Sequence, residues 1–249
     1  MKIKLKRGNI LEYTRYSYPS FGKKYNNEKA IISLTSWTAR INTVIKTLNS
    51  LMQQCPNFHI VLVLAEEEFP KLITDLPDNL LSLIDNKLIE IMFVKRNYRS
   101  FKKILFTMDK YRNVPIISAD DDCIYTCNYA QELYDEWLRN KTCVISMGSG
   151  ANGGSKKIPP YPTGSKSLYP PYCFKDFWKP YIYEISEKTN DDDTFYAFML
   201  NNIFNIKIHS DYPCKDVYIF HDEIKPMHED LSKYGYENAV KWIKTIINF

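Results

Sequence analysis

Three consecutive carboxylates, Asp120, Asp121 and Asp122, follow an apolar run in the segment PIISADDDCIY. Adjacent carboxylates repel one another, and a divalent cation that neutralises them makes such a cluster useful. A hard cation such as Mg2+ or Mn2+ takes oxygen ligands and keeps positions free for phosphate oxygens. The alternation of a strand end places Asp120 and Asp122 on one side and Asp121 on the other. We therefore predict that Asp120 and Asp122 bind a metal ion, with a solvated acidic turn as the alternative.

A second acidic run, Asp191 to Asp193, opens a predicted helix over residues 192–202. Carboxylates at a helix N-terminus interact favourably with the helix dipole, so a capping role explains one or two of them. Three in a row exceed what a cap needs, which makes this run a candidate for chemistry. The dipole is expected to keep these carboxylates ionised and to lower their basicity.

Polar residues also follow the first predicted strand, in the segment TSWTAR. The hydroxyls of Thr35 and Ser36 and the guanidinium of Arg40 suit ribose and phosphate oxygens. The alternative is a helix cap at Ser36 or Thr38 with a solvated Arg40. Lys103 is predicted to reach the same ligand, with a surface lysine as its alternative.

Apolar runs alternate with amphipathic segments through the first half of the chain, which indicates an α/β fold with a mostly parallel sheet flanked by helices. The predicted strands cover residues 29–35, 59–65, 88–94 and 114–118, and the predicted helices cover 41–52, 77–85 and 100–111. Ligands bind beyond the carboxyl ends of such strands, so TSWTAR and the acidic triplet should face one crevice.

The second half of the chain is more mixed in character. Beside the helix that begins at residue 192, we expect a helix at 128–139, a strand at 142–147, a long loop at 148–172, short strands at 206–209 and 217–220, and a helix at 237–247. Tyr169 and Tyr172 of this loop are candidates for stacking on a ring of a bound ligand, such as a sugar. The sequence shows no linker and no repeat, so residues 1–249 are predicted to form a single domain, with halves at about 29–127 and 128–249.

Composition excludes several classes of protein. The 249 residues carry a net charge of +4 without a concentrated basic face, so a nucleic-acid partner is not expected. No apolar run is long enough to span a membrane, and the N-terminus lacks the apolar core of a secretory signal. The six cysteines suit reduced thiols, so a cytoplasmic location is expected. The basic residues 2–7 could contact an anionic membrane surface, although a solvated strand is the plainer interpretation.

Five segments in order, SLTSWTARI, SFKKIL, ADDDCIY, LYPPYCF and DDDTFYAFML, resemble bacterial GT-A glycosyltransferases that build surface polysaccharides such as capsule or lipopolysaccharide. The resemblance covers about residues 30–210. It implies a GT-A type Rossmann-like sheet with a mixed acceptor-binding half. It also implies transfer of a hexose from a nucleotide sugar, with UDP as the expected nucleotide, to a glycan or lipid-linked acceptor. Peripheral contact with the inner membrane would bring such an enzyme to its lipid-linked acceptors.

The resemblance also assigns roles to individual residues. It implies that Thr35, Ser36, Arg40, Lys103, Asp120 and Asp121 hold the nucleotide sugar. Asp193 is the expected general base that takes the proton of the acceptor hydroxyl, with Asp192 as the alternative. His221 is the expected third metal ligand, next to Lys225 and Pro226 of a late histidine motif whose glycine is missing here. His228 and the absence of a histidine ligand stay open.

Other functions remain compatible with the residues. Paired carboxylates with a metal ion also serve nucleotidyl transfer and phosphate hydrolysis. A non-catalytic carbohydrate-binding protein is a further alternative, although it would not need the acidic triplet. The stereochemistry of transfer, retaining or inverting, is left open by the sequence.

Overall fold

The computed structural model describes residues 17–54, 56–147, 162–212, 217–219 and 236–248. Its centre is an eight-stranded sheet with the order β1-β4-β3-β2-β5-β8-β7-β9. All of its strands run in the same direction except β1 and β8, which are antiparallel to their neighbours. The strands are β1 (Ser20–Gly22), β2 (Ala30–Thr35), β3 (Phe58–Ala65), β4 (Glu90–Val94), β5 (Ile116–Ser118), β7 (Val144–Met147), β8 (Ser167–Tyr169) and β9 (Ile208–Tyr212).

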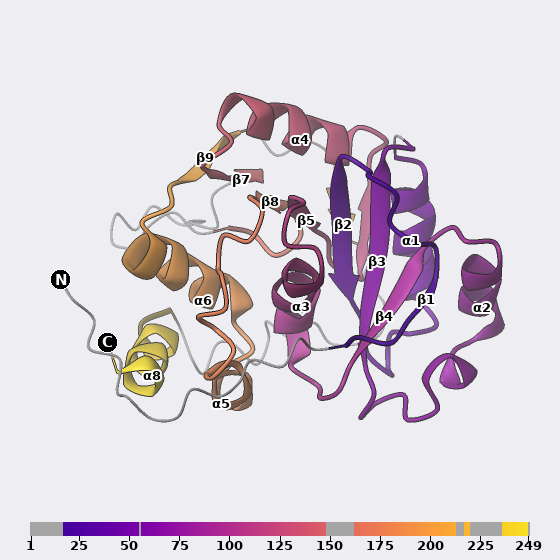
Figure 1. Ribbon diagram of the computed structural model, residues 1–249, viewed down its shortest axis with the longest axis horizontal. Helices are drawn as coiled ribbons and strands as arrows, with labels where there is room; N and C mark the ends of the chain where they lie inside the picture. The colour runs from indigo at the N-terminus through magenta and orange to yellow at the C-terminus, as the bar shows by residue number, and fades with distance from the viewer. Residues whose placement is uncertain (1–16, 55, 148–161, 213–216, 220–235, 249) are drawn as a thin grey trace.

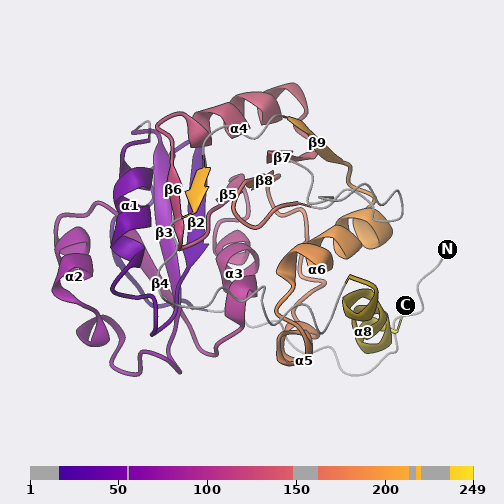
Figure 2. The same cartoon turned by 180° about the vertical axis from the view of Figure 1, so that it is seen from behind.

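The central strands are apolar on both sides because helices cover both faces of the sheet (Figures 1 and 2). On β2, Ile32 and Leu34 face one core and Ile31 faces the other. Helices α1 (Val44–Met52), α2 (Asp78–Asp85) and α4 (Tyr129–Arg139) pack on the first face. Helices α3 (Lys102–Lys110), α5 (Ile182–Lys188), α6 (Asp192–Phe198) and α8 (Tyr236–Ile247) pack on the second.

A second, two-stranded sheet joins β6 (Cys123–Tyr125) to β10 (Val217–Ile219) in antiparallel pairing. β6 lies directly after the acidic triplet and packs beside α1. The small sheet therefore fixes the chain on the C-terminal side of the triplet, and β5 fixes it on the N-terminal side.

The predicted α/β class and mostly parallel sheet are confirmed, and most elements lie within a few residues of their predicted bounds. The predicted loop over 148–172 is wrong in part, because residues 167–169 form β8 between β5 and β7. The predicted helix over 192–202 changes after Phe198 into a π-helical segment, Met199–Phe204, that ends at Asn205 in a left-handed conformation. The elements β1, β6 and α5 were not predicted, and the single-domain assignment stays a prediction.

No helix in the described part of the chain combines the length and apolar character needed to cross a bilayer. The four cysteines within the described ranges, Cys123, Cys127, Cys143 and Cys173, are free thiols.

Candidate functional site

A cavity of about 480 Å³ lies at the carboxyl end of the parallel strands. β2 and β5 are parallel neighbours in which Ser33 pairs with Ser118, so the segments that follow them meet at one edge. The cavity lining includes the residues predicted to bind the metal, to bind the nucleotide or to act as base: Thr35, Ser36, Arg40, Lys103, Asp120, Asp121, Asp122, Asp192 and Asp193. His221 and His228 lie outside the described residues. The predicted crevice between TSWTAR and the triplet is therefore present, and its volume is in the range typical of small-ligand sites.

The acidic triplet splits into a buried and two more accessible carboxylates. Asp121 is 8% exposed and accepts hydrogen bonds from Ser36 Oγ (2.7 Å) and Arg40 Nη1 (2.9 Å). The same Arg40 nitrogen lies 2.8 Å from Asp122 Oδ2. Burial outweighs these favourable contacts and raises the pKa of Asp121. Ser36 and Arg40 line the cavity but direct their hydrogen bonds to the triplet, so they position its carboxylates.

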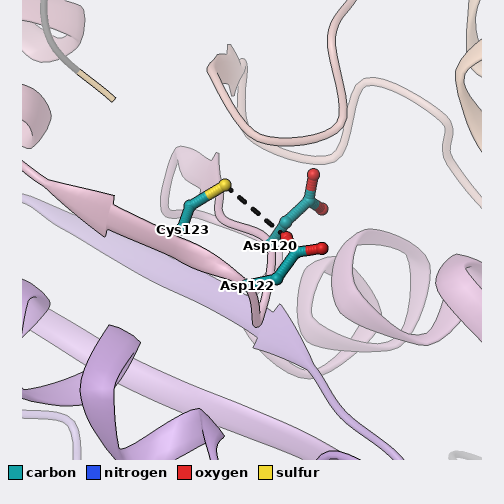
Figure 3. Close-up of side chains that lie close together, drawn as sticks. All are labelled: Asp120, Asp122 and Cys123. Atoms are coloured by element: carbon teal, nitrogen blue, oxygen red, sulfur yellow. Dashed lines mark hydrogen bonds between the residues drawn. The ribbon is translucent and has the colours of Figure 1, made fainter. Parts of the chain in front are cut away.

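Asp120 and Asp122 point to a common region, and Figure 3 shows their side chains beside Cys123. One ligand atom from each of these three residues lies within 4.8 Å of the others. Sulfur is a soft ligand, and hard cations such as Mg2+ and Mn2+ prefer oxygen, so Cys123 is the least suited of the three. Two half-buried carboxylates remain, and they fit a hard cation that keeps positions for phosphate oxygens. Asp120 and Asp122 would hold such an ion.

Lys103 connects the triplet to the second acidic run. Its Nζ lies 2.8 Å from Asp120 Oδ1 and 3.4 Å from Asp192 Oδ2, and the residue is 4% exposed. Ser33 on β2 donates a hydrogen bond to the backbone carbonyl of Lys103, which anchors the start of α3 on the sheet. Burial opposes the charge of Lys103, but the carboxylates of Asp120, Asp192 and Asp193 outweigh it and raise its pKa. The lysine is therefore a fixed cation between the two acidic groups.

The three aspartates that open α6 have different partners. Asp191 is the helix cap, since its carboxylate accepts from the backbone N–H of Thr194 at 2.9 Å and from the Thr194 hydroxyl. Asp193 Oδ2 accepts from the backbone N–H of Gly164 at 3.0 Å, and its Oδ1 is buried without a hydrogen-bond partner. Asp192 is paired with Lys103. Because Asp191 satisfies the helix end, Asp192 and Asp193 are left to face the cavity.

The expected lowering of basicity by the helix dipole is wrong for these two side chains. Burial, followed by the charge of Asp192, raises the pKa of Asp193 well above its usual range. Burial also raises the pKa of Asp192, against the opposing charge of Lys103. Desolvation and carboxylate repulsion exceed the effect of one short helix. A carboxylate whose pKa is raised is a stronger proton acceptor when it is ionised.

Gly164 lies where the two acidic groups approach each other. A Cβ at this position would lie 2.8 Å from Lys103 Nζ, 3.3 Å from Asp193 Oδ1 and 3.5 Å from Asp120 Oδ1. A side chain here would crowd the lysine between its carboxylates. The sequence placed this loop on the acceptor side but did not single out Gly164.

Further residues line the cavity that sequence reasoning missed. They are Trp37, Asn97, Arg99, Ser100, Lys102, Gly164 and Asn190. Several precede α3, and their signal in the sequence was a cluster of polar residues after the strand that became β4. Trp37 stands inside the TSWTAR segment and is 40% exposed.

The expectation that Tyr169 stacks on a sugar is wrong. Its side chain is completely buried and packs against Phe174 and Tyr196, with ring centroids 5.7 Å apart in both pairs. Tyr172 is half-buried outside the cavity, and Arg112 lies over its ring at 4.6 Å. Tyr169 is therefore structural, whereas stacking of Tyr172 on a sugar stays a prediction.

No family model matches the sequence, and no curated protein matches it. Solved structures are similar in fold. The mannosyltransferase PcManGT from Pyrobaculum calidifontis, in complex with GDP-Man and Mn2+, has a TM-score of 0.57 at 10% identity, over 94% of this chain and 72% of that chain. TarS 1-349 from S. aureus, in complex with UDP-GlcNAc, has a TM-score of 0.51 at 14% identity, over 87% of this chain and 67% of that chain.

At these identities the similarity concerns the fold alone. The mixed, mostly parallel sheet with helices on both faces thus has the GT-A-like fold of glycosyltransferases.

Proposed function

We propose that the protein is a metal-dependent glycosyltransferase that moves a hexose from a nucleotide sugar, with UDP as the expected nucleotide, to a glycan or lipid-linked acceptor. The observation that carries the proposal is the convergence of two acidic groups in one cavity. Asp120 and Asp122 offer a metal site at the end of β5, and Asp192 and Asp193 face it from α6. The fold shared with structures that hold UDP-GlcNAc, or GDP-Man and Mn2+, supports the same proposal.

The two groups have separate chemical roles in this proposal. Mn2+ or Mg2+, when bound, supplies positive charge for the donor diphosphate. Ser36 and Arg40 hold Asp121 and Asp122 in place, and Thr35 lines the donor side of the cavity. Asp193 accepts the proton of the acceptor hydroxyl as the oxygen attacks the anomeric carbon and the bond to the diphosphate breaks. Lys103 fixes the spacing between donor and base.

Asp193 is the proposed base because of its contacts. Its Oδ2 is held by the Gly164 N–H and its Oδ1 lacks a partner, so one oxygen is oriented and the other can accept a proton. Asp192 Oδ2 also lacks a hydrogen-bond partner, but it lies 3.4 Å from the charge of Lys103 and Asp192 is buried, whereas Asp193 is partly exposed. A hydroxyl that approaches the cavity therefore meets Asp193 as the more available acceptor.

The deciding experiment is a thermal-shift measurement with UDP, UDP-sugars and GDP-sugars in the presence of Mn2+ or of a chelator. A ligand at 100 times its Kd stabilises a protein by about 2.7 kcal/mol, a shift of roughly 5–10 °C for a chain of this size. We expect the shift with Mn2+ or Mg2+ and not with chelator. Asp122→Asn should abolish the metal-dependent shift and retain the fold, whereas Asp85→Asn on α2 should behave as wild type.

Full nucleotide affinity in excess chelator would contradict metal dependence. Products then separate the enzyme classes. A glycosyltransferase releases the nucleoside diphosphate and glycosylates the acceptor. Release of a nucleoside monophosphate or inorganic phosphate with no glycosylated product would point instead to nucleotidyl transfer or hydrolysis.

A further inference from the structure

Four cationic side chains line the cavity, and one of them differs from the rest in its partners. The cavity cations are Arg40, Arg99, Lys102 and Lys103. Three are bound to carboxylates: Arg40 to Asp121 and Asp122, Lys102 to Glu68, and Lys103 to Asp120 and Asp192. Among the described residues, no ion pair joins Arg99 to a carboxylate. Arg99 instead donates from Nη1 to the side-chain carbonyl of Asn190, which is a neutral amide.

Arg99 is exposed to solvent at the edge of the cavity, while the paired cations are buried. Arg40 is 8% exposed, Lys102 1% and Lys103 4%. The charge on these three is already used to neutralise the acidic residues of the chain itself. Arg99 is therefore the cavity cation that a ligand from solution can reach without displacing a carboxylate.

The backbone holds Arg99 in an unusual conformation. Its φ is +53°, in the left-handed region, which costs a residue with a side chain about 1 kcal/mol or more. The N–H of Arg99 donates to Asn97 Oδ1 at 2.9 Å, and Lys102 Nζ donates to the same oxygen at 2.7 Å. Such a conformation persists only where surrounding contacts hold the residue, and here the Asn97 side chain does so.

We propose that Arg99 binds the diphosphate of the donor. This inference rests on the proposed function, and it assigns Arg99 as a further positively charged residue of the donor site. A guanidinium presents parallel N–H groups that match two phosphate oxygens, and the anion adds a Coulomb attraction that the neutral Asn190 amide does not supply. Phosphate therefore replaces the Asn190 amide at a gain. Arg99 follows β4, whose carboxyl end lies on the same edge of the sheet as the ends of β2 and β5.

The test compares binding of nucleoside diphosphates and nucleosides by calorimetry in the presence of Mn2+. UDP and GDP are measured beside uridine and guanosine. Arg99→Gln removes the charge and keeps a hydrogen-bond donor. Arg99→Lys keeps the charge and loses the planar fork. Arg96→Gln is the matched control, since Arg96 is an exposed arginine of the same loop that lies over the Tyr183 ring and does not line the cavity.

We expect Arg99→Gln to weaken binding of the preferred diphosphate about 10-fold or more, the value of a hydrogen bond to a charged group, and to leave nucleoside binding unchanged. Arg99→Lys should fall between this variant and wild type, and Arg96→Gln should match wild type. Unchanged diphosphate affinity in Arg99→Gln would overturn this inference and leave the proposed function intact. The same holds if Arg99→Gln raises the KM of an anionic acceptor while diphosphate affinity is unchanged, because Arg99 would then bind the acceptor. Failure of the wild-type protein to bind any nucleoside diphosphate would overturn the proposed function together with this inference.

Discussion

The carboxylates of Asp191, Asp192 and Asp193 are adjacent in the chain and meet three different environments. Asp191 caps the N-terminus of α6, and Asp192 forms an ion pair with the buried Lys103. Asp193 accepts a hydrogen bond from the backbone N–H of Gly164, in a loop distant in sequence. Substitutions at these three positions should therefore have three separable effects.

Asp193→Asn tests the proposed base directly. The amide cannot accept the proton, so kcat should fall by about 10²–10⁴-fold while the Kd of the donor stays near wild type. Turnover is measured with donor and acceptor, and donor binding is measured by calorimetry. Asp191→Ala is the control at the cap: it should lower the free energy of unfolding by about 1 kcal/mol with little effect on kcat at low temperature.

Asp192→Asn tests whether the base is Asp192 rather than Asp193. If Asp192→Asn is slow and Asp193→Asn is active, the base is Asp192. If both variants are active, neither carboxylate is the base, and a retaining mechanism becomes the better account, with the leaving phosphate accepting the proton.

Sequence reasoning reached the ligand-facing residues because their positions follow from strand order. Asp120, Asp122 and Ser36 come directly after parallel neighbours, so their approach could be predicted without coordinates. Arg99 and Gly164 could not be found in this way. Each matters because of side chains that distant segments bring next to it in the folded chain. In the sequence alone, Arg99 cannot be told from any other surface arginine.

At the scale of elements, the C-terminus of α2 has a backbone conformation in which the residue after the helix cap is usually glycine. The N–H of Lys87 bonds the carbonyl of Ile84 at 2.9 Å, and the N–H of Leu88 bonds that of Leu83 at 3.0 Å. These two bonds define a Schellman motif, in which the residue after the helix cap adopts a left-handed conformation. Lys87 has a φ of +55° and is exposed.

Lys87→Gly should increase the free energy of unfolding by about 0.5–1 kcal/mol, because glycine adopts this conformation without the steric cost of a Cβ. Urea denaturation measures the change. Lys87→Ala retains the Cβ and should bring no such gain, which separates relief of backbone strain from loss of the lysine charge. A neutral or destabilising glycine would show that the backbone is not strained here.

Helices and strands could be predicted where their pattern of apolar residues extends over enough positions to be recognised. Strands β2 and β3 are continuous apolar runs, covered on both faces. β1 and β8 are three residues long, and their pairing depends on partners far along the chain. β8 was hidden in a segment with many turn-forming residues, and no local signal distinguishes its Ser167–Tyr169 from a loop.

At the scale of the whole molecule, a buried polar group joins the sheet to α3 at the end remote from the cavity. Glu90 on β4 is 2% exposed and lies 2.7 Å from His59 Nε2 on β3. It also accepts from Lys110 at the end of α3 and from the Tyr111 hydroxyl. Burial alone would raise the pKa of Glu90, but the His59 hydrogen bond and the Lys110 charge lower it to about 2.

This group makes stability depend on pH. Because the pKa of Glu90 is lower in the folded state than its ordinary 4.5, the ionised side chain stabilises the fold above about pH 4.5. That contribution is lost as the pH falls from about 4.5 toward 2. The difference in unfolding free energy between wild type and Glu90→Gln should therefore shrink by about 1 kcal/mol between pH 6 and roughly pH 3.5.

Urea denaturation of wild type and Glu90→Gln at the two pH values gives the unfolding free energies from which the two differences are calculated. Glu184→Gln, on the exposed side of α5, is the control, and its difference from wild type should stay constant. A constant difference for Glu90→Gln would show that the protonation of Glu90 is the same in both states of the chain.

The position of β8 also has a consequence for how the protein is made. β5 and β7 are separated in the sheet by β8, whose residues lie later in the chain than either of them. While the ribosome emits the first half, β2, β3, β4 and β5 can already pair, but β7 has no neighbour on that side until residues 167–169 emerge. The insertion of β8 also brings in Gly164, three residues upstream, whose N–H holds Asp193. Pairing between segments so distant in sequence is slow to form. A chain that has already formed the sheet edge with the acidic triplet can thus still lack the Gly164–Asp193 hydrogen bond. If Asp193 is the proposed base, turnover should begin only once β8 has paired.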